Sequence, residues 1–388
     1  MKLVQMKLVF LSVVVAASSW NAGAQMPTGS SSGEASSASV VSASRPIRVA
    51  VAGLVHDHAL GMFGALARNH NVTLVGISES DKNLISLYSQ RFSLASTLFY
   101  PNEARMIEAT HPDAVLVYTS IADHRKAIEI AARHHVNAMV EKPLATTMED
   151  ALAIRKIARE DHIQVLVNYE TTWYASNAYV LKAADDGQLG TVHKVIVRDG
   201  HEGPKEIGVS PTFLNWLTDP AKNGAGAMFD FGCYGADLMT VMMHGEAPLS
   251  VTAVAQTDKP EVYPHVDDDA TIVLHYKTAQ AVLLPSWNWT TGVKNMEVYG
   301  TKEQATTVKA EGVELLGADG KASSLTAPAL AADRADSLGY LVGVLRGEVK
   351  PEGDLTALST NMVVMQILDA ARRSAKEGRT VMVTPVPK

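Results

Sequence analysis

The sequence has little cysteine and no strong excess of charge. Cys233 is its one cysteine, so a disulfide within the chain is excluded. Charged residues make up 19% of the composition and the formal net charge is −7. This balance, with no nucleic-acid motif in the sequence, predicts no nucleic-acid partner. With 388 residues, 47% of them hydrophobic, the chain is long enough for two domains with sizeable cores.

The first 44 residues are not expected to belong to the fold. Two lysines precede the apolar run Leu8–Ala17, which is too short to span a bilayer comfortably. Ala22-Gly23-Ala24 then offers a small-residue cleavage site, so residues 1–24 are predicted to be a signal peptide. Residues 25–44 are rich in Ser, Ala and Gly and are typical of a flexible leader. We therefore expect a periplasmic or secreted protein without a stable membrane anchor.

Apolar runs alternate with helical patterns over residues 45–168. The runs are short, rich in Val and Ala, and typical of buried strands; they lie at 47–52, 72–77, 114–118, 137–140 and 164–168. The segments between them have helical spacing at 60–69, 82–92, 121–134 and 148–161. This alternation predicts a doubly wound parallel sheet of the Rossmann type. Ligands bind at the carboxyl ends of such strands, so the residues just after each strand should share one edge.

The pattern changes in residues 169–354. Extended runs that alternate apolar and polar residues occur at 192–198, 250–256, 270–276, 280–287 and 294–299. They predict a second α/β domain with an open, mainly antiparallel sheet. The exposed face of such a sheet needs a cover, which a homodimer or homotetramer would supply. Residues 355–388 contain a long helix ending at Gly378, which we expect to pack back on the first domain.

The turn after the first strand is a candidate nucleotide site. Gly53 corresponds to the first glycine of the dinucleotide fingerprint, whereas Val55 and His58 replace the second and third. From the motif alone, an ordinary strand-to-helix turn is an equal alternative. The predicted neighbours of the pyrophosphate are Gly53, Val55, His56, Asp57 and His58.

A carboxylate follows the second strand. Glu79 lies 26 positions after Gly53, where an acid accepts hydrogen bonds from an adenosine ribose, and it favours NAD over NADP. Asp81 is a competitor for the same role. The two histidines beside Asp57 also suggest a metal, but adjacent residues in a turn seldom point at one ion. We predict no metal site.

Lys142 is the predicted catalytic residue. It lies in the turn Glu141-Lys142-Pro143, at the end of a predicted strand. A lysine beside a cofactor cleft can polarise a carbonyl or help to remove a hydroxyl proton. The residues alone leave open a surface lysine paired with Glu141.

A glycine-rich segment at 223–237 carries Asp230 and Tyr234, four positions apart. If it opens a helix, both side chains share one face, and a nearby lysine would favour the phenolate of Tyr234. The glycines would let the chain approach a ligand closely. The alternative is a helix start in which Asp230 is only a cap. Trp287 is expected to be a sheet residue.

These two motifs together resemble the glucose-fructose oxidoreductase, inositol dehydrogenase and MocA family (Gfo/Idh/MocA), over about residues 45–383. The resemblance implies a Rossmann domain, a C-terminal domain whose open sheet is used in oligomerisation, and NAD(H) or NADP(H). It also implies a sugar or cyclitol substrate. Lys142 and Asp230 look like the family's lysine and aspartate, and Tyr234 stands where many members have histidine.

The resemblance extends to other site residues. Ser120 and His124 lie in a segment similar to the family's Thr-Pro-Asn-x-x-His, with Ser and Ile in place of Pro and Asn. Trp216 looks like the tryptophan near the nicotinamide, and Leu217 replaces the arginine that often follows it. Glu141 is also predicted to contact the cofactor. Polar and aromatic residues that follow strands suit a polyhydroxylated substrate, and those predicted to contact it are Tyr169, His201 and Lys205.

Three functions fit this sequence. The first is an NAD-dependent oxidoreductase acting on a sugar, cyclitol or sugar derivative, with Lys142, Asp230 and Tyr234 handling the proton. The second is a glycosidase or lyase that retains NAD and oxidises its substrate transiently, which suits a compartment without a free nicotinamide pool. The third is a non-catalytic sugar-binding protein, which the altered glycine turn supports.

Overall fold

The computed structural model describes residues 45–384. The predicted signal peptide (1–24) and leader (25–44) therefore lie outside the described residues. Among the helices that are described, none combines the length and the apolar character needed to cross a bilayer.

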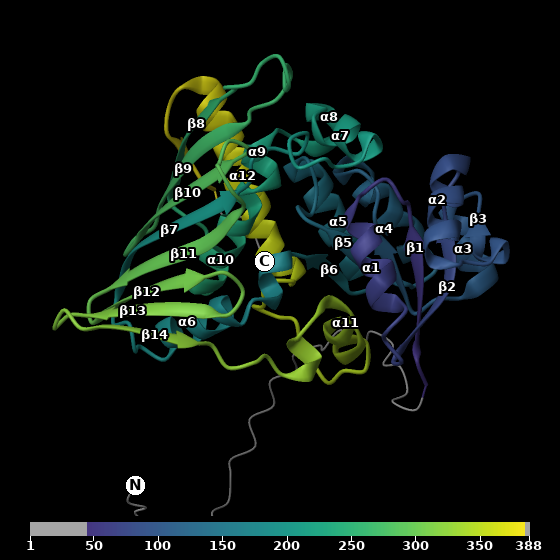
Figure 1. Cartoon of the computed structure of the whole chain (residues 1–388), viewed down its shortest axis with the longest axis horizontal. Coiled ribbons are helices and arrows are strands. Elements are labelled where there is room, and N and C mark those ends of the chain that lie inside the picture. Colours follow the sequence, from purple (N-terminus) through teal and green to yellow (C-terminus); the bar gives the residue numbers. More distant parts are fainter. Residues whose placement is uncertain (1–44, 385–388) are drawn as a thin grey trace, which may run out of the picture. The chain divides into compact units, whose positions relative to one another are not determined.

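The N-terminal domain contains one parallel sheet, which confirms the predicted doubly wound fold (Figure 1). Within the described chain its six strands are ordered β3-β2-β1-β4-β5-β6, and every neighbouring pair is parallel. The strands are β1 (Ile47–Ala52), β2 (Val72–Ser78), β3 (Phe99–Tyr100), β4 (Ala114–Val117), β5 (Asn137–Glu141) and β6 (Val165–Asn168). The connecting helices are α1 (His58–Leu66), α2 (Lys82–Phe92), α3 (Glu103–Thr110), α4 (His124–Ala132) and α5 (Met148–Glu160).

The helix ends of this domain follow ordinary capping chemistry. The Asp81 side chain accepts a hydrogen bond from the N–H of Asn83 at the start of α2, and the Thr147 hydroxyl accepts one from Asp150 at the start of α5. β4 and β5 are buried along their whole length, as expected for central parallel strands. The carboxyl ends of the strands therefore have fixed positions.

The second sheet is larger than predicted. Within residues 45–384 it has nine strands, ordered β14-β13-β12-β11-β7-β10-β9-β8-β15, and only β7 and β10 pair in parallel. The strands are β7 (Val192–Gly200), β8 (Ser250–Gln256), β9 (Asp269–His275), β10 (Gln280–Ser286), β11 (Val293–Gly300), β12 (Glu303–Val308), β13 (Gly312–Gly317), β14 (Ala322–Thr326) and β15 (Val381–Met382). The helices that contact this sheet include α6 (Ala175–Asp185), α9 (Ala227–Asp230), α10 (Gly232–Met242) and α12 (Leu358–Glu377).

The last helix packs on both domains. α12 contacts α10 and β8 of the second domain as well as α5 and β6 of the first, and Gly378 ends it with a left-handed φ of 63°. The helix was expected to pack back on the first domain, and it contacts the second domain as well. Another helix, α11 (Ser337–Leu345), was not predicted, and its Leu338 and Leu341 share a core with Ile47 and Val49 of β1. Residues assigned to the second domain thus return to the first before α12 begins.

Candidate active site

Lys142 and Asp230 form a buried ion pair between the two domains. Lys142 follows β5, and Asp230 ends the short helix α9 (Ala227–Asp230). The Lys142 ammonium contacts the Asp230 carboxylate and donates to its backbone carbonyl at 2.9 Å. The indole N–H of Trp287 donates to the other carboxylate oxygen at 2.9 Å. Lys142 is 5% exposed and Asp230 is 6% exposed, so both members of the pair are buried. Lys142 is therefore not a surface lysine paired with Glu141.

The backbone around Gly226 fixes the position of α9. A Cβ at Gly226 would lie 1.7 Å from the carbonyl oxygen of Asp267, so only glycine fits there. The Asp267 carboxylate accepts hydrogen bonds from Gly226 N at 2.8 Å and Met228 N at 2.7 Å. Asp267 therefore caps this helix, which leaves Asp230 free to face Lys142. The glycines of this segment were expected to let the chain approach a ligand closely. At Gly226 the chain instead approaches its own backbone, at Asp267.

The pair is ionised at neutral pH. Burial lowers the pKa of Lys142, but the charge and hydrogen bond of Asp230, together with Cys233 and Glu141, outweigh burial, so the net shift is upward. Burial raises the pKa of Asp230, but Lys142 outweighs it and the net shift is downward. The resting lysine is therefore an ammonium, which can donate a proton or a hydrogen bond but cannot accept a proton.

Tyr234 lies in the first turn of α10, 1% exposed, beside two lysines. The ammonium of Lys142 lies 5.2 Å from its ring centroid and that of Lys294, on β11, lies 5.0 Å from it. Burial raises the pKa of Tyr234 well above its usual value, and the acid Glu170 adds to the rise. The predicted phenolate is therefore wrong. Tyr234 is a neutral phenol whose ring, more than its hydroxyl, interacts with the lysines.

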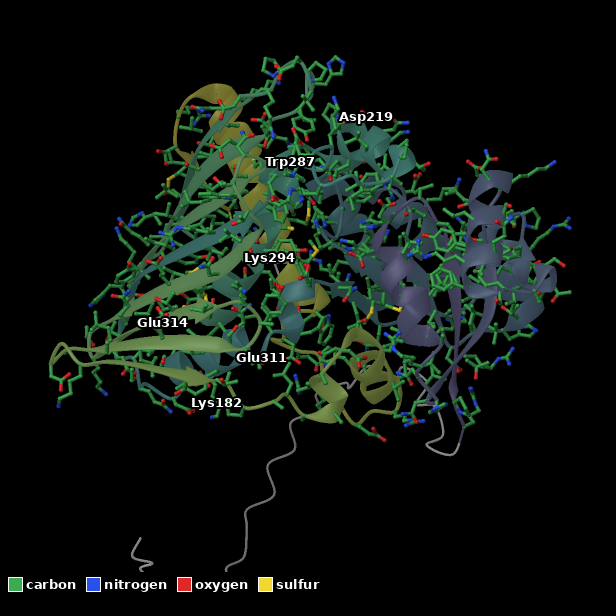
Figure 2. The ribbon with its side chains drawn as sticks, in the orientation of Figure 1. Lys182, Asp219, Trp287, Lys294, Glu311 and Glu314 are labelled. Atoms are coloured by element: carbon green, nitrogen blue, oxygen red, sulfur yellow. The ribbon has the colours of Figure 1, made fainter. Side chains whose placement is uncertain are left out.

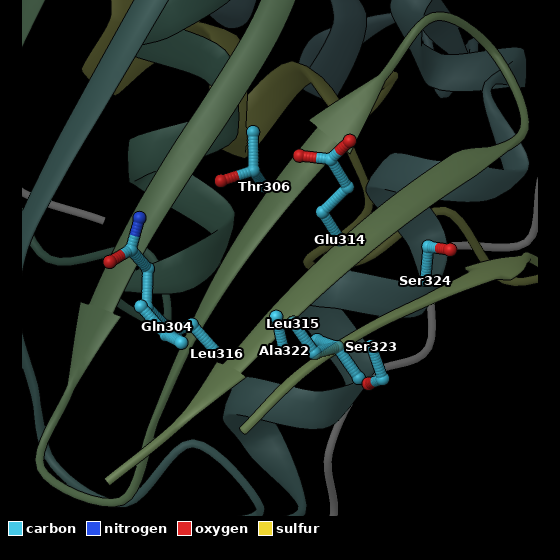
Figure 3. A pocket seen from close by; sticks show the side chains of 8 residues that line it. All are labelled: Gln304, Thr306, Glu314, Leu315, Leu316, Ala322, Ser323 and Ser324. Atoms are coloured by element: carbon cyan, nitrogen blue, oxygen red, sulfur yellow. The ribbon is translucent and has the colours of Figure 1, made fainter. Parts of the chain in front are cut away.

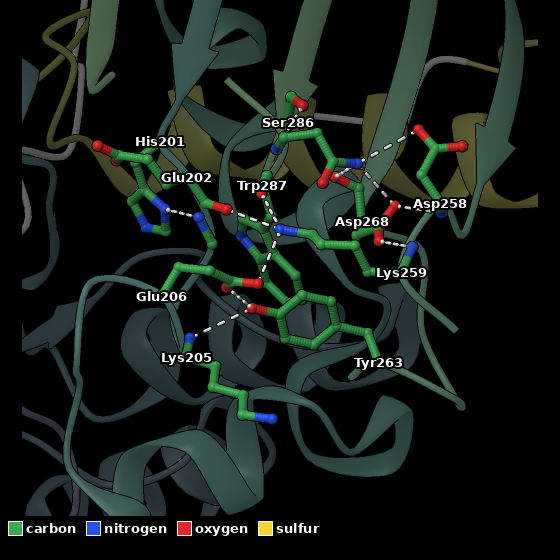
Figure 4. Close-up of polar contacts among 12 residues, drawn as sticks. His201, Glu202, Lys205, Glu206, Asp258, Lys259, Tyr263, Asp268, Ser286 and Trp287 are labelled. Atoms are coloured by element: carbon green, nitrogen blue, oxygen red, sulfur yellow. Dashed lines mark hydrogen bonds and ion pairs between the residues drawn. The ribbon is translucent and has the colours of Figure 1, made fainter. Parts of the chain in front are cut away.

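The three residues that were predicted to contact the substrate lie in three different environments. His201 lies beside the site, with its ring edge-on to Phe231 at 5.0 Å, and burial lowers its pKa, so it is neutral at pH 7. Tyr169 is fully buried, and its hydroxyl donates to Asn361 of α12 at 2.7 Å, so it packs behind Tyr234 and presents no free group. Lys205 is exposed and its side chain extends away from the neighbouring polar groups (Figure 4).

Trp287 has a role that the sequence did not reveal. It follows β10 and is fully buried (Figure 2). The centroid of its ring lies 5.1 Å from that of the Tyr263 ring (Figure 4). The Lys259 ammonium donates to its carbonyl at 2.8 Å and pairs with Glu206 at 3.1 Å. Glu206 in turn accepts from the Tyr263 hydroxyl at 2.5 Å. These contacts hold the indole that orients Asp230.

The turn after β1 fits a nucleotide. Gly53 has a φ of +78°, and a Cβ there would lie 2.9 Å from Thr119 Cγ2, so this position requires glycine. Within the described residues, the N–H groups of Val55 and Asp57 have no protein acceptor, whereas His56 N donates to Tyr118 O at 3.2 Å. Two free amides next to the start of α1 are suitable donors for a phosphate. The residues present therefore fit a dinucleotide despite the altered fingerprint.

Glu79 is positioned by the same turn. Its carboxylate accepts hydrogen bonds from Leu54 N at 2.9 Å, Ser80 N at 2.7 Å and Asp81 N at 2.9 Å. These bonds hold it at the carboxyl end of β2, next to the turn. The competing Asp81 is the cap of α2 and so already has a structural role.

A helix of the second domain covers the turn. α7 (Pro211–Leu217) begins at Ser210, whose N–H and hydroxyl donate to the Asp57 carboxylate at 2.7 and 2.6 Å. The indole of Trp216 donates to Val55 O at 3.0 Å. The ring of His56 contacts those of Phe213, at 4.6 Å, and Trp216, at 5.3 Å. Trp216 is thus placed against the nucleotide turn.

Glu141, the residue before Lys142, meets both histidines of the turn. One potential ligand atom from each of His56, His58 and Glu141 lies within 4.8 Å of the others. The sequence argument was that adjacent residues in a turn seldom point at one ion. That argument does not hold here, because Glu141 comes from a different strand, β5, and meets both histidines. In this structure Glu141 is 2.9 Å from His58 Nδ1 and accepts from Asn168 at 2.9 Å, so these groups satisfy one another.

The segment after β4 supports the loop that follows Lys142. Ser120 donates to Asp123 at 2.6 Å, which is a local turn bond. His124 is fully buried, and its Nδ1 lies 3.2 Å from the carbonyl of Leu144. Burial lowers its pKa to about 4, so it is neutral. Its Nε2 is buried without a partner among the described residues, so a group that binds there can donate to it.

The chain matches known family models in both domains. Residues 47–169 match the model described as an oxidoreductase family with an NAD-binding Rossmann fold, and residues 178–306 match the GFO/IDH/MocA C-terminal domain. Inositol 2-dehydrogenase of Rhizobium meliloti (strain 1021) is 25% identical over 308 residues, which cover 73% of this chain and 86% of the relative. D-apiose dehydrogenase of Paraburkholderia graminis is 27% identical over 136 residues, 33% of this chain, and the match spans only 36% of that relative.

Solved structures share the fold. An aldose-aldose oxidoreductase from Caulobacter crescentus, complexed with glycerol, has a TM-score of 0.73 and 22% identity, with 87% of this chain and 100% of that chain covered. An inositol dehydrogenase homolog from Azotobacter vinelandii, complexed with NAD+, has a TM-score of 0.75 and 17% identity, with 90% and 99% covered. At these sequence identities the similarity shows a shared fold and nothing further.

The Lys142–Asp230 pair yields a stability prediction. Lys142→Met leaves a buried carboxylate without its cation and should lower the free energy of unfolding by about 3–5 kcal/mol. Adding Asp230→Asn removes the stranded charge and should restore most of the loss. Urea unfolding at pH 7 measures both. Lys182→Met, which breaks the exposed pair with Asp186, is the control and should leave the free energy of unfolding nearly unchanged, because water screens that pair. A double variant no more stable than the single one would contradict this account.

Proposed function

The chain belongs to the GFO/IDH/MocA oxidoreductase family, and on that basis we propose that it transfers hydride between a nicotinamide dinucleotide and a sugar, cyclitol or sugar derivative. The observation that carries the proposal is the buried Lys142–Asp230 pair at the carboxyl end of β5. When bound, the nicotinamide supplies the hydride acceptor or donor. The protein supplies the proton site and the binding groups.

The charge state of the pair gives each residue a role. Lys142 holds a proton on Nζ and donates it to the substrate oxygen when a carbonyl is reduced. For oxidation of a carbinol, Lys142 must first lose that proton, which Asp230 resists by raising the pKa of the lysine. Asp230 is thus the positioning residue of the lysine, and the ring of Tyr234 stabilises the ammonium by a cation–π contact.

We further propose that NAD is preferred over NADP. Glu79 presents a carboxylate at the end of β2, and this charge would repel a ribose 2′-phosphate. Leu217 supplies no positive charge that could compensate.

A second candidate, favoured by the cover over the nucleotide turn, is a glycosidase or lyase that keeps its NAD. α7 is tied to the turn by the contacts of Ser210 and Trp216, so a dinucleotide bound there would leave only after this helix moves. Retention suits the proposed periplasmic or secreted location, where no nicotinamide pool would recycle the cofactor. In such a cycle the substrate would pass a hydride to NAD and eliminate a substituent with a proton. In a glycosidase, but not in a lyase, water would then add to the unsaturated intermediate, and the same hydride would return to the substrate.

We propose a homodimer or homotetramer formed through the outer face of the second sheet. Thr252, Val273, Val282, Ile196 and Glu297 form one cross-strand row on that face. The row is only partly exposed and its centre is apolar, whereas the neighbouring row is fully buried. A groove over β12–β14 lies on the same face (Figure 3). A second copy would cover the apolar centre.

Hydride transfer tests the first proposal. Lys142→Arg keeps the positive charge, but a guanidinium does not release its proton in a protein. We expect kcat to fall about 10²- to 10⁴-fold, with the Kd for NAD nearly unchanged. The assay follows reduced nicotinamide with a panel of aldoses and cyclitols, and titrations with NAD and NADP give the preference. Lys182→Arg, on an exposed face of α6, is the control.

Two results would change the conclusion. Wild-type turnover in Lys142→Arg would remove Lys142 from the proton transfer. A folded wild-type protein that binds neither NAD nor NADP would instead favour a non-catalytic sugar-binding protein.

Release of the nucleotide separates the two candidate activities. Ser210→Ala removes the hydroxyl bond to Asp57, so NAD should dissociate about 10-fold faster or more, as expected for a lost bond to a charged group. Stopped-flow displacement measures the rate. Asn102→Ala, which removes the cap of α3, is the matched control. Equal rates of NAD release from wild type and Ser210→Ala would contradict a retaining role for α7.

The products distinguish the two activities directly. Glycoside cleavage without accumulation of NADH would support the closed cycle.

The proposed oligomer is tested by placing a charge in its contact. Val282→Lys should convert the assembly to monomers in sedimentation velocity, because a buried lysine without a partner is unfavourable. Leu87→Lys, on an exposed position of α2, should leave the assembly intact. A wild-type protein that sediments as a monomer would refute the proposal.

A further inference from the structure

Asp199 is a buried carboxyl that the catalytic pair does not use. It lies near the end of β7, is 3% exposed, and its Oδ2 has no hydrogen-bond partner among the described residues. Val195 and Val197 precede it on the same buried face of the strand. An apolar residue would be the stable choice at such a position, because an unsatisfied buried carboxyl oxygen carries a desolvation cost.

The surroundings of Asp199 differ from those of an ordinary buried acid. Lys294 lies directly opposite it on β11, and the same ammonium lies over the rings of Tyr234 and Phe231. Lys294 also pairs with Glu170. Lys142 contacts the same two rings. Two polar groups therefore border the aromatic pair, one around Lys142 and the other around Lys294.

Within residues 45–384, only one of these polar groups is satisfied. Around Lys142, both oxygens of Asp230 have partners, namely the lysine and the indole of Trp287. Around Lys294, Asp199 keeps a buried oxygen that has no partner among the described residues. A polyol has several hydroxyl groups besides the one that reacts, and each needs a partner when it leaves water. The second group is suited to that task.

We propose that Asp199 is a specificity-determining residue whose free carboxyl oxygen binds a non-reacting hydroxyl of the polyol substrate, on the side of Tyr234 lined by Lys294. This inference rests on the proposed function. It assigns Lys142 and Asp230 to the reacting carbon, and Asp199 and Lys294 to recognition of the rest of the ring.

The protonation state of Asp199 gives a pH signature. Burial raises its pKa to about 8, with Lys294 and Lys142 opposing the rise and Glu170 adding to it. Below that pH it is a neutral acid that donates to a hydroxyl oxygen, and above it the donor is lost. The pKa of Glu170 is lowered, while those of Lys142, Tyr174 and Cys233, which also face Asp199, are raised. With pKa 8, ligand affinity should fall about 10-fold between pH 7 and pH 9.

The experiment is calorimetric titration of the NAD-saturated protein with myo-inositol, D-glucose and D-xylose. Asp199→Asn gives a neutral isostere that still donates a hydrogen bond, so for each sugar that wild type binds it should keep the Kd at pH 7 within about twofold and remove the dependence of the Kd on pH between 7 and 9. Asp199→Leu has no donor and should raise the Kd at pH 7 about 10-fold. The Kd for NAD, measured separately, should not change.

Asp237 supplies the matched control. It is another buried aspartate, on α10, and one of its oxygens also lacks a partner among the described residues, but burial is the sole cause of its raised pKa. Asp237→Asn should leave the sugar Kd within about twofold of wild type at both pH 7 and pH 9. A purely structural role for Asp199 would instead lower the melting temperature and leave the Kd and its pH dependence unchanged.

The outcomes distinguish this inference from the proposed function. If wild type binds a sugar and Asp199→Asn keeps the same pH dependence, or Asp199→Leu binds that sugar equally well at pH 7, the role of Asp199 is refuted and the proposed function stands. If the NAD-saturated wild type binds none of the three compounds, the inference is overturned together with the sugar and cyclitol assignment.

Discussion

The ion pair between Lys142 and Asp230 is the interaction on which the site depends. Each charge is buried, and each would be costly without the other. The two residues come from different domains and lie 88 positions apart in the sequence. The ion pair therefore exists only where the carboxyl end of β5 meets the end of α9. Gly226, Asp267 and Trp287 serve that meeting, because they fix where the aspartate points.

The fold was predictable where local patterns carry the information. The runs at 47–52 and 250–256 are strands in the structure, and 82–92 is a helix, because each has a clear period and a clear end. β13 and β14 were missed because their sequences are short and partly polar, so they are recognisable only through pairing with β12. α11 was missed because its run of apolar residues has little periodicity to indicate a helix.

The sequence predicted which candidate catalytic residues lie together, and it predicted their surroundings less well. Lys142, Asp230 and Tyr234 follow from two motifs, and the structure brings them together. The state of Tyr234 did not follow, because burial outweighs the two lysine charges and sequence spacing says nothing about burial. Asp199 and Trp287 carry no local signal. They matter through cross-strand register and long-range hydrogen bonds, which only the fold defines.

The position of α12 has a consequence for how the protein matures. This helix follows both domains in the chain and packs on each of them, and its Asn361 binds the hydroxyl of Tyr169 behind Tyr234. Domains tend to fold in the order in which they are synthesised, so the Rossmann sheet can form early. The packing behind Tyr234 cannot be completed until α12 is in place. A chain that lacks α12 therefore leaves Tyr169 without the hydrogen bond that holds it behind Tyr234.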